Sequence, residues 1–327
     1  EARCRGTQDG AVVTCEHEHV PTEHLVALEA RLAVRPGPHA LIYAQDKGRM
    51  TKRLGELGIS CPRNAIVECL DEVQAFGFPC VLKTTKGGYD GKGVWIVRDR
   101  ADARSVVDAA AVNGATLLAE ELVDFRRELS ALIARSPSGQ VAAWPVVQTT
   151  QRDSICHEVI APAPDLDPDL GDRALQIAMT ICGELDVVGV MAVELFETTD
   201  GRVLVNELAM RPHNTGHWTQ DGAITSQFEN HLRAVLDLPL GAPQPRTPWT
   251  VMVNILGGAQ EAGQLYDGYL HTMAKDPQLK VHLYGKQMRP GRKVGHVNAY
   301  GDDLDDCLER ARHAAAWFAG ELGDDSD

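Results

Sequence analysis

The sequence predicts a mixed α/β (α+β) protein, and three observations support that prediction. Short apolar stretches of strand length, such as residues 190–196, alternate with longer stretches of helical length, such as residues 168–183. Proline-rich breaks interrupt the chain twice. The 327 residues suffice for two or three modules. We therefore expect an N-terminal piece, a central module with a small subdomain at about 60–120, and a C-terminal α+β module, over residues 1–40, 45–238 and 248–320.

The expected elements follow in chain order. Residues 11–15 form a strand, and a helix over residues 22–33 begins at Thr22, whose hydroxyl is suited to capping it. A helix over residues 45–57 contains Gly48, at a cost of about 1 kcal/mol. The other expected strands are 78–84, 94–97, 116–120, several within 128–160, 190–196, 203–207, 251–256, 279–284 and 294–299, and the other expected helices are 101–111, 168–183, 225–236 and one from about 303.

Composition excludes some classes of partner. The net charge of −14 and the pI of about 5.3 argue against non-specific binding to nucleic acid or to an anionic membrane surface. No apolar run is long enough to cross a bilayer. The eight cysteines include no Cys-x-x-Cys pair, which favours a reduced, cytoplasmic location. The chain opens without Met and reads as if it begins part-way through a domain.

The most informative pattern is a hairpin that carries two carboxylates. Residues 190–196 and 203–207 read as its strands, and residues 199–202 read as the tight turn between them. This arrangement brings Glu194 and Glu207 to the same face. Two neighbouring carboxylates repel unless a cation lies between them, and Mg²⁺ holding nucleotide phosphates is the simplest candidate. The alternative is a solvated acidic hairpin.

A glycine-rich loop between two strands predicts a phosphate-binding site. Residues 86–93 hold four glycines, which allow positive φ and let backbone N–H groups converge on an anion. Lys83 and Lys86 add positive charge. The loop is neither a Walker A loop nor a Rossmann fingerprint, because a strand follows it and the required residues are missing. A plain glycine hairpin is the alternative.

Three further segments carry weaker signals. Glu120-Glu121-Leu122-Val123 at a strand end, with Glu128 beyond it, is typical of nucleotide binding, although such acids are often only solvated. Arg211, His213, Asn214 and His217 form an anion-friendly loop directly after the hairpin. A segment with four cations and no acid is either a solvated turn or a pocket for a substrate phosphate, and those cations are Lys286, Arg289, Arg292 and Lys293.

Together these motifs resemble the ATP-grasp superfamily and, within it, the N5-carboxyaminoimidazole ribonucleotide synthetases of purine biosynthesis. The resemblance runs from about residue 11 to about residue 310. It rests on four strings: Gly87-Gly88-Tyr89-Asp90-Gly91-Lys92-Gly93, Asn206-Glu207-Leu208-Ala209 continuing through Arg211-Pro212-His213-Asn214-Thr215-Gly216-His217-Trp218-Thr219, the segment 221–229, and Arg289-Pro290-Gly291-Arg292-Lys293-Val294-Gly295-His296.

The resemblance implies an ATP-grasp fold and an ATP-dependent carbon–nitrogen ligase. The implied substrates are ATP, bicarbonate and 5-aminoimidazole ribonucleotide, with Mg²⁺ (or Mn²⁺) as the metal and carboxyphosphate as the intermediate. It also implies a cytoplasmic homodimer. By motif position, Glu194 and Glu207 bind the metal with help from Asn206. The implied nucleotide contacts are Lys83, Gly87, Gly88, Gly91, Gly93, Glu120, Glu121, Leu122, Val123 and Glu128.

The resemblance also assigns the carboxylation chemistry. Arg211, His213 and Asn214 would line the bicarbonate and carboxyphosphate site, and Asp90 would hold the substrate amine. The expected contacts to the ribonucleotide are Glu18, Tyr89, Lys92, Lys286, Arg289, Arg292 and Lys293.

The sequence departs from the family in several places. The family's glycine-rich opening string, Gly-Gly-Gly-Gln-Leu-Gly-Arg-Met, is missing, so residues 1–40 read as a remnant of a Rossmann-like N-terminal domain. Gln151, Lys92 and Met210 stand where the family often has His, Arg and Pro. Two alternatives to the carboxylating ligase therefore stay open: an inactive, truncated nucleotide-binding protein, and an ATP-grasp ligase that acts on another amine.

Overall fold

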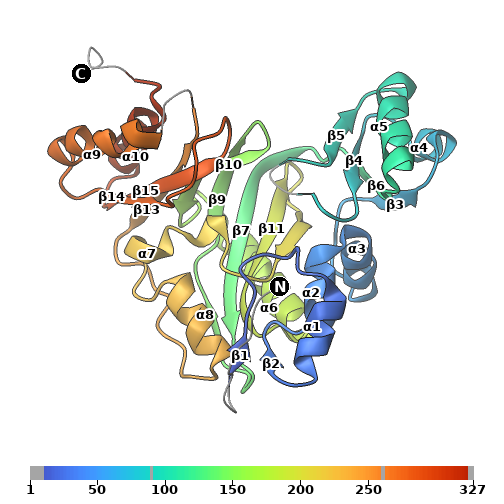
Figure 1. Cartoon of the computed structure of the whole chain (residues 1–327), viewed down its shortest axis with the longest axis horizontal. Coiled ribbons are helices and arrows are strands. Elements are labelled where there is room, and N and C mark those ends of the chain that lie inside the picture. The colour runs from blue at the N-terminus through green and yellow to red at the C-terminus, as the bar shows by residue number, and fades with distance from the viewer. Residues whose placement is uncertain (1–10, 89–90, 259–261, 323–327) are drawn as a thin grey trace.

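A large, mostly antiparallel sheet forms the centre of the molecule. The computed structural model describes residues 11–88, 91–258 and 262–322 (Figure 1). Within them the sheet has nine strands in the order β12-β11-β7-β9-β10-β13-β15-β14, with β8 paired to β7. The strands are β7 (Phe125–Arg135), β8 (Val141–Ala143), β9 (Val147–Arg152), β10 (Ile155–Ala161), β11 (Gly189–Thr198), β12 (Val203–Ala209), β13 (Trp249–Leu256), β14 (Lys280–Leu283) and β15 (Lys293–Gly301).

A small lobe projects from one side of this sheet (Figure 1). It is a four-stranded sheet in the order β3-β6-β4-β5, covered by two helices. Its apolar core includes Val73, Leu82 and Val97, all almost fully buried. The elements are β3 (Asn64–Val67), β4 (Cys80–Thr84), β5 (Val94–Val97), β6 (Leu117–Glu121), α4 (Leu70–Phe76) and α5 (Arg100–Asn113).

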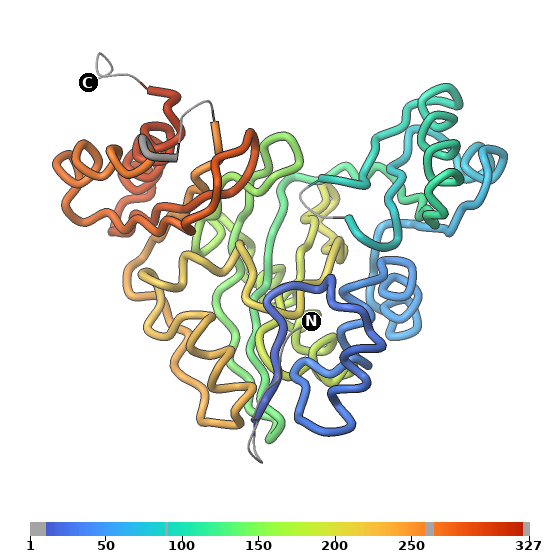
Figure 2. Tube along the Cα trace, in the orientation of Figure 1, coloured from blue at the N-terminus to red at the C-terminus, as the bar shows by residue number. Residues whose placement is uncertain are grey.

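The N-terminal segment packs against the central sheet, and Figure 2 shows its blue trace lying against the central strands. Two short parallel strands and three helices share one core with the long helix α6 (Pro168–Glu184) and the apolar side chains of β11 and β12. These elements are β1 (Val12–Val13), α1 (Thr22–Glu29), β2 (Ala33–Val34), α2 (Pro38–Gln45) and α3 (Lys47–Glu56).

Two expectations for this segment are wrong. Thr22 does not cap α1. It is the first helical residue, and its hydroxyl donates to Gln45 instead (2.9 Å). The helix expected over residues 45–57 is α3, which begins only at Lys47 because Asp46 has an extended backbone and its carboxylate caps the helix; the preceding helix α2 was not expected. Gly48 therefore lies in the first turn of α3, where a Cβ would come within 2.9 Å of the Ile66 side chain.

The C-terminal strands extend the central sheet. β13 pairs with β10, so the strands expected in a C-terminal α+β module continue the same sheet as the carboxylate hairpin. One face of β13 and β15 is apolar and packs against α10 (Leu304–Ala319) and α9 (Ala262–Lys275). Helices α4 and α9 were not expected, because α4 is only 7 residues long and Gly268 interrupts the pattern of α9.

The opposite face of β13 and β15 is polar and faces the loop that follows the hairpin. That face presents Thr250, Asn254, His296 and Asn298, all nearly fully buried. The loop contains the 3₁₀ turn η1 (Asn214–Gly216), the short helix α7 (Thr219–Gly222) and the helix α8 (Gln227–Val235). Among the described residues, no helix is both long and apolar enough to cross a membrane.

Close packing of α7 on β13 generates a stability prediction. A Cβ added to Gly222 would lie 2.3 Å from Thr250 Oγ1 and 2.8 Å from Thr250 Cβ. Since Thr250 is buried and branched at Cβ, we expect Gly222→Ala to lower the free energy of unfolding by about 1–3 kcal/mol in urea denaturation. Gly55→Ala is the matched control. It has no neighbour within 4 Å and should raise that free energy by up to about 1 kcal/mol. Equal midpoints for the two variants would contradict the proposed close contact.

Candidate active site

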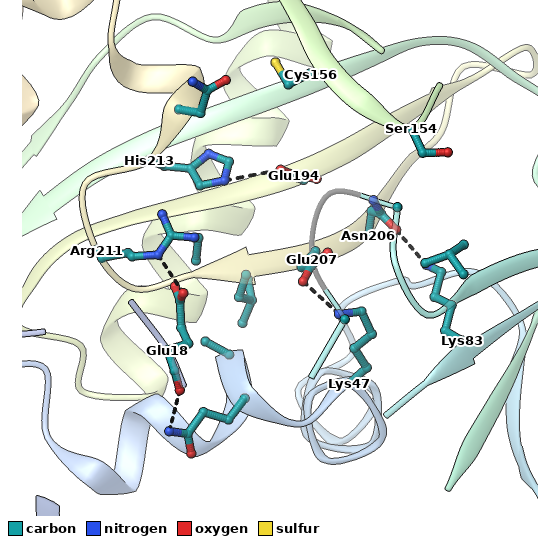
Figure 3. A pocket seen from close by; sticks show the side chains of 18 of the residues that line it. Glu18, Lys47, Lys83, Ser154, Cys156, Glu194, Asn206, Glu207, Arg211 and His213 are labelled. Atoms are coloured by element: carbon teal, nitrogen blue, oxygen red, sulfur yellow. Dashed lines mark hydrogen bonds and ion pairs between the residues drawn. The ribbon is translucent and has the colours of Figure 1, made fainter. Parts of the chain in front are cut away.

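A cleft of about 2200 Å³ lies between the small lobe, the N-terminal segment and the central sheet. Figure 3 shows that the labelled side chains come from the small lobe, the N-terminal segment and the central sheet. Many sequence-predicted site residues line this cleft: Glu18, Lys83, Gly87, Gly88, Gly91, Glu120, Glu121, Leu122, Val123, Glu128, Glu194, Asn206, Glu207, Arg211, His213, Asn214, Lys286 and Lys293. Lys92, Gly93, Arg289 and Arg292 are not among the lining residues, and Tyr89 and Asp90 lie outside the described residues.

The two hairpin carboxylates lie next to each other. Glu194 of β11 and Glu207 of β12 are directly paired in register, next to an irregularity that follows Glu194. Their expected proximity is therefore confirmed. Burial, with repulsion from Glu207 and Glu128, raises the pKa of Glu194. The pair is thus built to accept positive charge, because a cation would relieve both the repulsion and the cost of burial.

Lys47, which was missed by sequence reasoning, supplies part of that charge, whereas Lys83 is paired with another carboxylate. Lys47 Nζ lies 2.8 Å from Glu207 Oε1, although the two residues are 160 positions apart (Figure 3). Lys83 Nζ donates to Asn206 (2.9 Å) and lies 2.5 Å from Glu120. Lys47 is buried at the start of α3, and the only sequence signal for it is its place directly after the capping Asp46.

Arg211 is held by a carboxylate from the N-terminal segment. Its Nε lies 2.6 Å from Glu18 Oε2, and a second guanidinium nitrogen donates to the Pro212 carbonyl (3.1 Å). The Gln45 amide fixes the Glu18 segment by donating to the Glu18 and Val20 carbonyls. Glu18 Oε1 is buried without a hydrogen-bond partner among the described residues. Glu18, which was expected to contact the ribonucleotide, and Arg211, which was expected to contact bicarbonate, thus form one ion pair.

His213 has a defined protonation state. Its Nδ1 accepts from the Thr215 backbone N–H, which places the proton of the neutral ring on Nε2, 3.5 Å from Glu194 Oε1. Burial, followed by the charges of Arg211 and Lys293, holds the pKa of His213 well below its ordinary value. His213 is therefore a neutral imidazole that directs an N–H towards the carboxylate pair.

Asn214 and the backbone of His213 are braced by groups that sequence reasoning did not single out. The Asn214 and Asn254 amides face each other at 2.7–2.9 Å, and Asn254 also donates to the Cys156 carbonyl. Gln227, fully buried, accepts from the His213 N–H and donates to the His213 carbonyl, both at 2.8 Å. Gln227 lies within the segment 221–229, which is part of the resemblance to the family, but the sequence pattern there predicted only the start of a helix.

Apolar side chains also line the cleft. Leu122 is 44% exposed there, and Phe125 stacks on Phe196 with ring centroids 4.9 Å apart. Burial raises the pKa of Glu128 to about 7, and Lys83 only partly offsets this effect. An apolar surface with one poorly solvated carboxylate suits a base and its ribose hydroxyls.

Gly91 of the glycine loop packs directly against the side chain of Ser154. Gly91 has a φ of +74°, and an added Cβ would lie 2.5 Å from Ser154 Cβ on the β9–β10 hairpin. Only glycine fits both this conformation and this contact. Lys286 and Lys293 also line the cleft, whereas the exposed Arg289 and Arg292 do not.

Comparison with known proteins places this geometry in a family. The model described as "ATP-grasp domain" matches residues 52–228, and the one described as "Phosphoribosylaminoimidazole carboxylase C-terminal domain" matches residues 250–310. N5-carboxyaminoimidazole ribonucleotide synthase of Mycobacterium bovis is 55% identical over 94% of this chain and 73% of its own length. The synthase of Corynebacterium ammoniagenes is 47% identical over 97% of this chain and 79% of its own length.

The solved structures agree. The N5-carboxyaminoimidazole synthase of Aspergillus clavatus, in complex with ADP and 5-aminoimidazole ribonucleotide, superposes with a TM-score of 0.84 and 29% identity, covering 95% of this chain and 82% of that one. The fold is the ATP-grasp fold expected from the sequence. This chain belongs to the N5-carboxyaminoimidazole ribonucleotide synthase family of ATP-dependent ligases.

Proposed function

We propose that this chain uses ATP and bicarbonate to carboxylate 5-aminoimidazole ribonucleotide to N5-carboxyaminoimidazole ribonucleotide in purine biosynthesis. One observation supports this most strongly: a single cleft joins a carboxylate pair, Glu194 and Glu207, to a neighbouring set of anion-binding side chains, including Arg211 and Lys293. The first group suits phosphoryl transfer, and the second suits bicarbonate and a ribonucleotide phosphate.

The donor set fits Mg²⁺. In the described parts of the chain, no group of three or more His, Cys, Asp or Glu side chains is arranged to hold a metal alone. A pair of adjacent carboxylates, one of which (Glu194) has a pKa raised by burial, lies beside Asn206 and instead suits a cation whose remaining ligands are nucleotide phosphates and water. Glu194 and Glu207 would hold it, and the cation would neutralise charge on the transferring phosphoryl group.

Different side chains of the cleft would support different steps of the reaction. ATP transfers its γ-phosphoryl group to a bicarbonate oxygen, which gives ADP and carboxyphosphate. Carboxyphosphate breaks down to phosphate and CO₂, and the substrate's exocyclic amine attacks CO₂ and loses a proton. Lys83 and the glycine loop would hold the phosphates, and Arg211, His213 and Asn214 would hold the bicarbonate oxygens.

The adenosine and ribonucleotide contacts are also proposals. Residues 120–123 and Glu128, which line the cleft, would bind adenosine. Lys286 and Lys293 are the lining cations best placed for the 5′-phosphate. Assignments to Glu18, Tyr89, Asp90, Lys92, Arg289 and Arg292 stay predictions from the resemblance.

We propose further that the enzyme is a cytoplasmic homodimer. The cysteines in the described residues are free thiols, which fits a reducing compartment. Exposed apolar side chains on α9, including Leu270 at 83% exposure, offer a surface for a second copy. Light scattering during size-exclusion chromatography measures the mass and tests the dimer.

The activity is tested by measuring ADP release. We expect release to require both bicarbonate and 5-aminoimidazole ribonucleotide. ADP release with another amine but not with the ribonucleotide would favour a ligase for that amine. Nucleotide binding without any ADP release would favour an inactive nucleotide-binding protein.

The metal assignment predicts the effect of Glu207→Gln. Because the change removes one of two charges that would hold the cation, we expect kcat/KM to fall by at least roughly a hundredfold. Circular dichroism should show an unchanged fold. Asp200→Asn, at the exposed turn of the same hairpin, is the matched control and should keep the wild-type rate. A Glu207→Gln enzyme with a near-normal rate would contradict the assignment.

Burial of Glu128 predicts a pH-dependent stability. Its folded-state pKa of about 7 exceeds the ordinary value of 4.5, so its ionisation destabilises the unliganded protein progressively as pH rises through that window. We expect Glu128→Gln to raise the free energy of unfolding at pH 8 by about 2 kcal/mol and to have little effect near pH 4.5. The matched control is Glu68→Gln, at an exposed position. It should change the free energy of unfolding only slightly, and by the same amount at both pH values. A Glu128→Gln effect that does not change with pH would contradict this explanation.

A further inference from the structure

The tautomer of His217 is determined by its hydrogen bonds. The His213 backbone N–H donates to Gln227 Oε1 at 2.8 Å. Because a backbone N–H can only donate, this contact fixes which end of the Gln227 amide is oxygen. The amide nitrogen then donates to the His213 carbonyl at 2.8 Å and to His217 Nδ1 at 2.9 Å. Both N–H groups of Gln227 are thus used, and His217 Nδ1 is an acceptor.

A neutral His217 therefore carries its proton on Nε2. Burial, followed by the charge of Lys293, lowers the pKa of His217 to about 3, so the ring is neutral at physiological pH. His217 lines the cleft, and within the described part of the chain no side chain or backbone group is hydrogen-bonded to its Nε2. Nε2–H is thus the polar group that His217 offers to a molecule in the cleft.

The surrounding structure holds both partners rigidly. The His217 ring stacks on Phe228 with centroids 5.5 Å apart and on His296 with centroids 4.9 Å apart. Gln227 lies directly against Gly216, where an added Cβ would come within 2.4 Å of its Oε1. Thr219 Oγ1 accepts a hydrogen bond from the Gln227 backbone N–H and donates one to the Gly216 carbonyl. Such packing is what holds a donor in one direction.

The charges around His217 indicate what the donor binds. Lys293, Arg211 and Lys286 are all close enough to disfavour a proton on the ring. Arg211 is paired with Glu18, and Lys286 and Lys293 line the same cleft as His217. Cationic side chains together with an N–H donor suit an oxyanion as the chemical class of ligand.

We propose that His217 donates a hydrogen bond from Nε2–H to a substrate oxyanion and that Gln227 is the positioning residue that sets its tautomer. This inference rests on the proposed function. The oxyanion is either the 5′-phosphate of the ribonucleotide or a carboxylate oxygen derived from bicarbonate, and the two share the same recognition chemistry.

The first test needs no activity. Nitrogen-15 NMR of the wild-type protein labelled at histidine, with the His217 signals identified by their loss in His217→Asn, reports which ring nitrogen carries the proton. We expect neutral His217 protonated on Nε2 at pH 7. An Nδ1-protonated ring or an imidazolium would overturn the proposal whatever the enzyme's activity.

The second test compares two substitutions of His217. Asn can replace the Nδ1 contact with Gln227 but has no group at the Nε2 position, whereas Gln can place an N–H donor near that position. We expect His217→Asn to lower kcat/KM by roughly ten- to a hundredfold, the loss typical of one donor to a charged group. His217→Gln should recover part of that loss. Equal activity of both variants and the wild type would overturn the donor role.

Substrate dependence distinguishes the two oxyanions. If the partner is the phosphate, the defect of His217→Asn appears in the KM for the ribonucleotide and disappears with the dephosphorylated nucleoside as substrate. If the partner is the carboxylate, the defect appears in the KM for bicarbonate or in kcat and persists with the nucleoside. A defect in the KM for ATP alone would overturn both.

Gln227→Glu tests the positioning role. An ionised carboxylate has no N–H for the His213 carbonyl or for His217 Nδ1, so in a neutral His217 ring Nδ1 becomes the donor and Nε2 loses its proton. We expect a defect as large as that of His217→Asn, together with the change of tautomer in the NMR spectrum. An unchanged tautomer would overturn the role of Gln227. Loss of bicarbonate-dependent ADP release in the wild type would instead refute the proposed function, while the tautomer measurement would still stand.

Discussion

The cleft depends on one constraint, which is the repulsion between Glu194 and Glu207 on adjacent strands. Backbone pairing holds the two residues in register, so they cannot separate to relieve their repulsion. In the unliganded protein Lys47 neutralises Glu207, and the His213 N–H faces Glu194. Lys47 belongs to α3, and His213 belongs to the loop after β12. The charges of the hairpin therefore stabilise the packing of both segments against it. A cation with nucleotide phosphates would complete this charge balance.

The anion-binding side of the cleft follows the opposite principle, because its cations lie beside histidine rings that stay neutral. Burial keeps His217 and His296 uncharged by lowering their pKa values, and Tyr284 lies 2.6 Å from His296 Nδ1. Protonated histidines there would repel Lys293 and would compete with it for an anion. Neutral rings instead provide directed hydrogen bonds, while the lysine and arginine side chains provide the charge.

Local features of the sequence predicted much of this structure. The turn at residues 199–202 and its flanking apolar strands were sufficient to predict the hairpin, and that hairpin set the proximity of Glu194 to Glu207. Contacts between distant segments were not predictable in the same way. Lys47 and Glu207 are 160 positions apart, and no local pattern specifies their pairing; Lys83 was assigned to phosphate without its buried partner Glu120. Helices α2 and α3 are separated at Asp46, whose carboxylate caps α3, and helical periodicity does not reveal this break.

The continuity of the sheet explains why the C-terminal strands belong to the site. Val251 and Val253 face the helices α9 and α10, whereas Asn254 and Asn298 face the motif loop from the other side of the same strands. Asn254 needs the Asn214 amide, and Asn298 donates to the carboxylate of Asp221. Without the loop these buried amides would lose their partners, and without the strands the loop would lose its support. The anion-binding loop and the C-terminal strands are therefore one folding unit in energetic terms, although they lie in segments matched by two different family models.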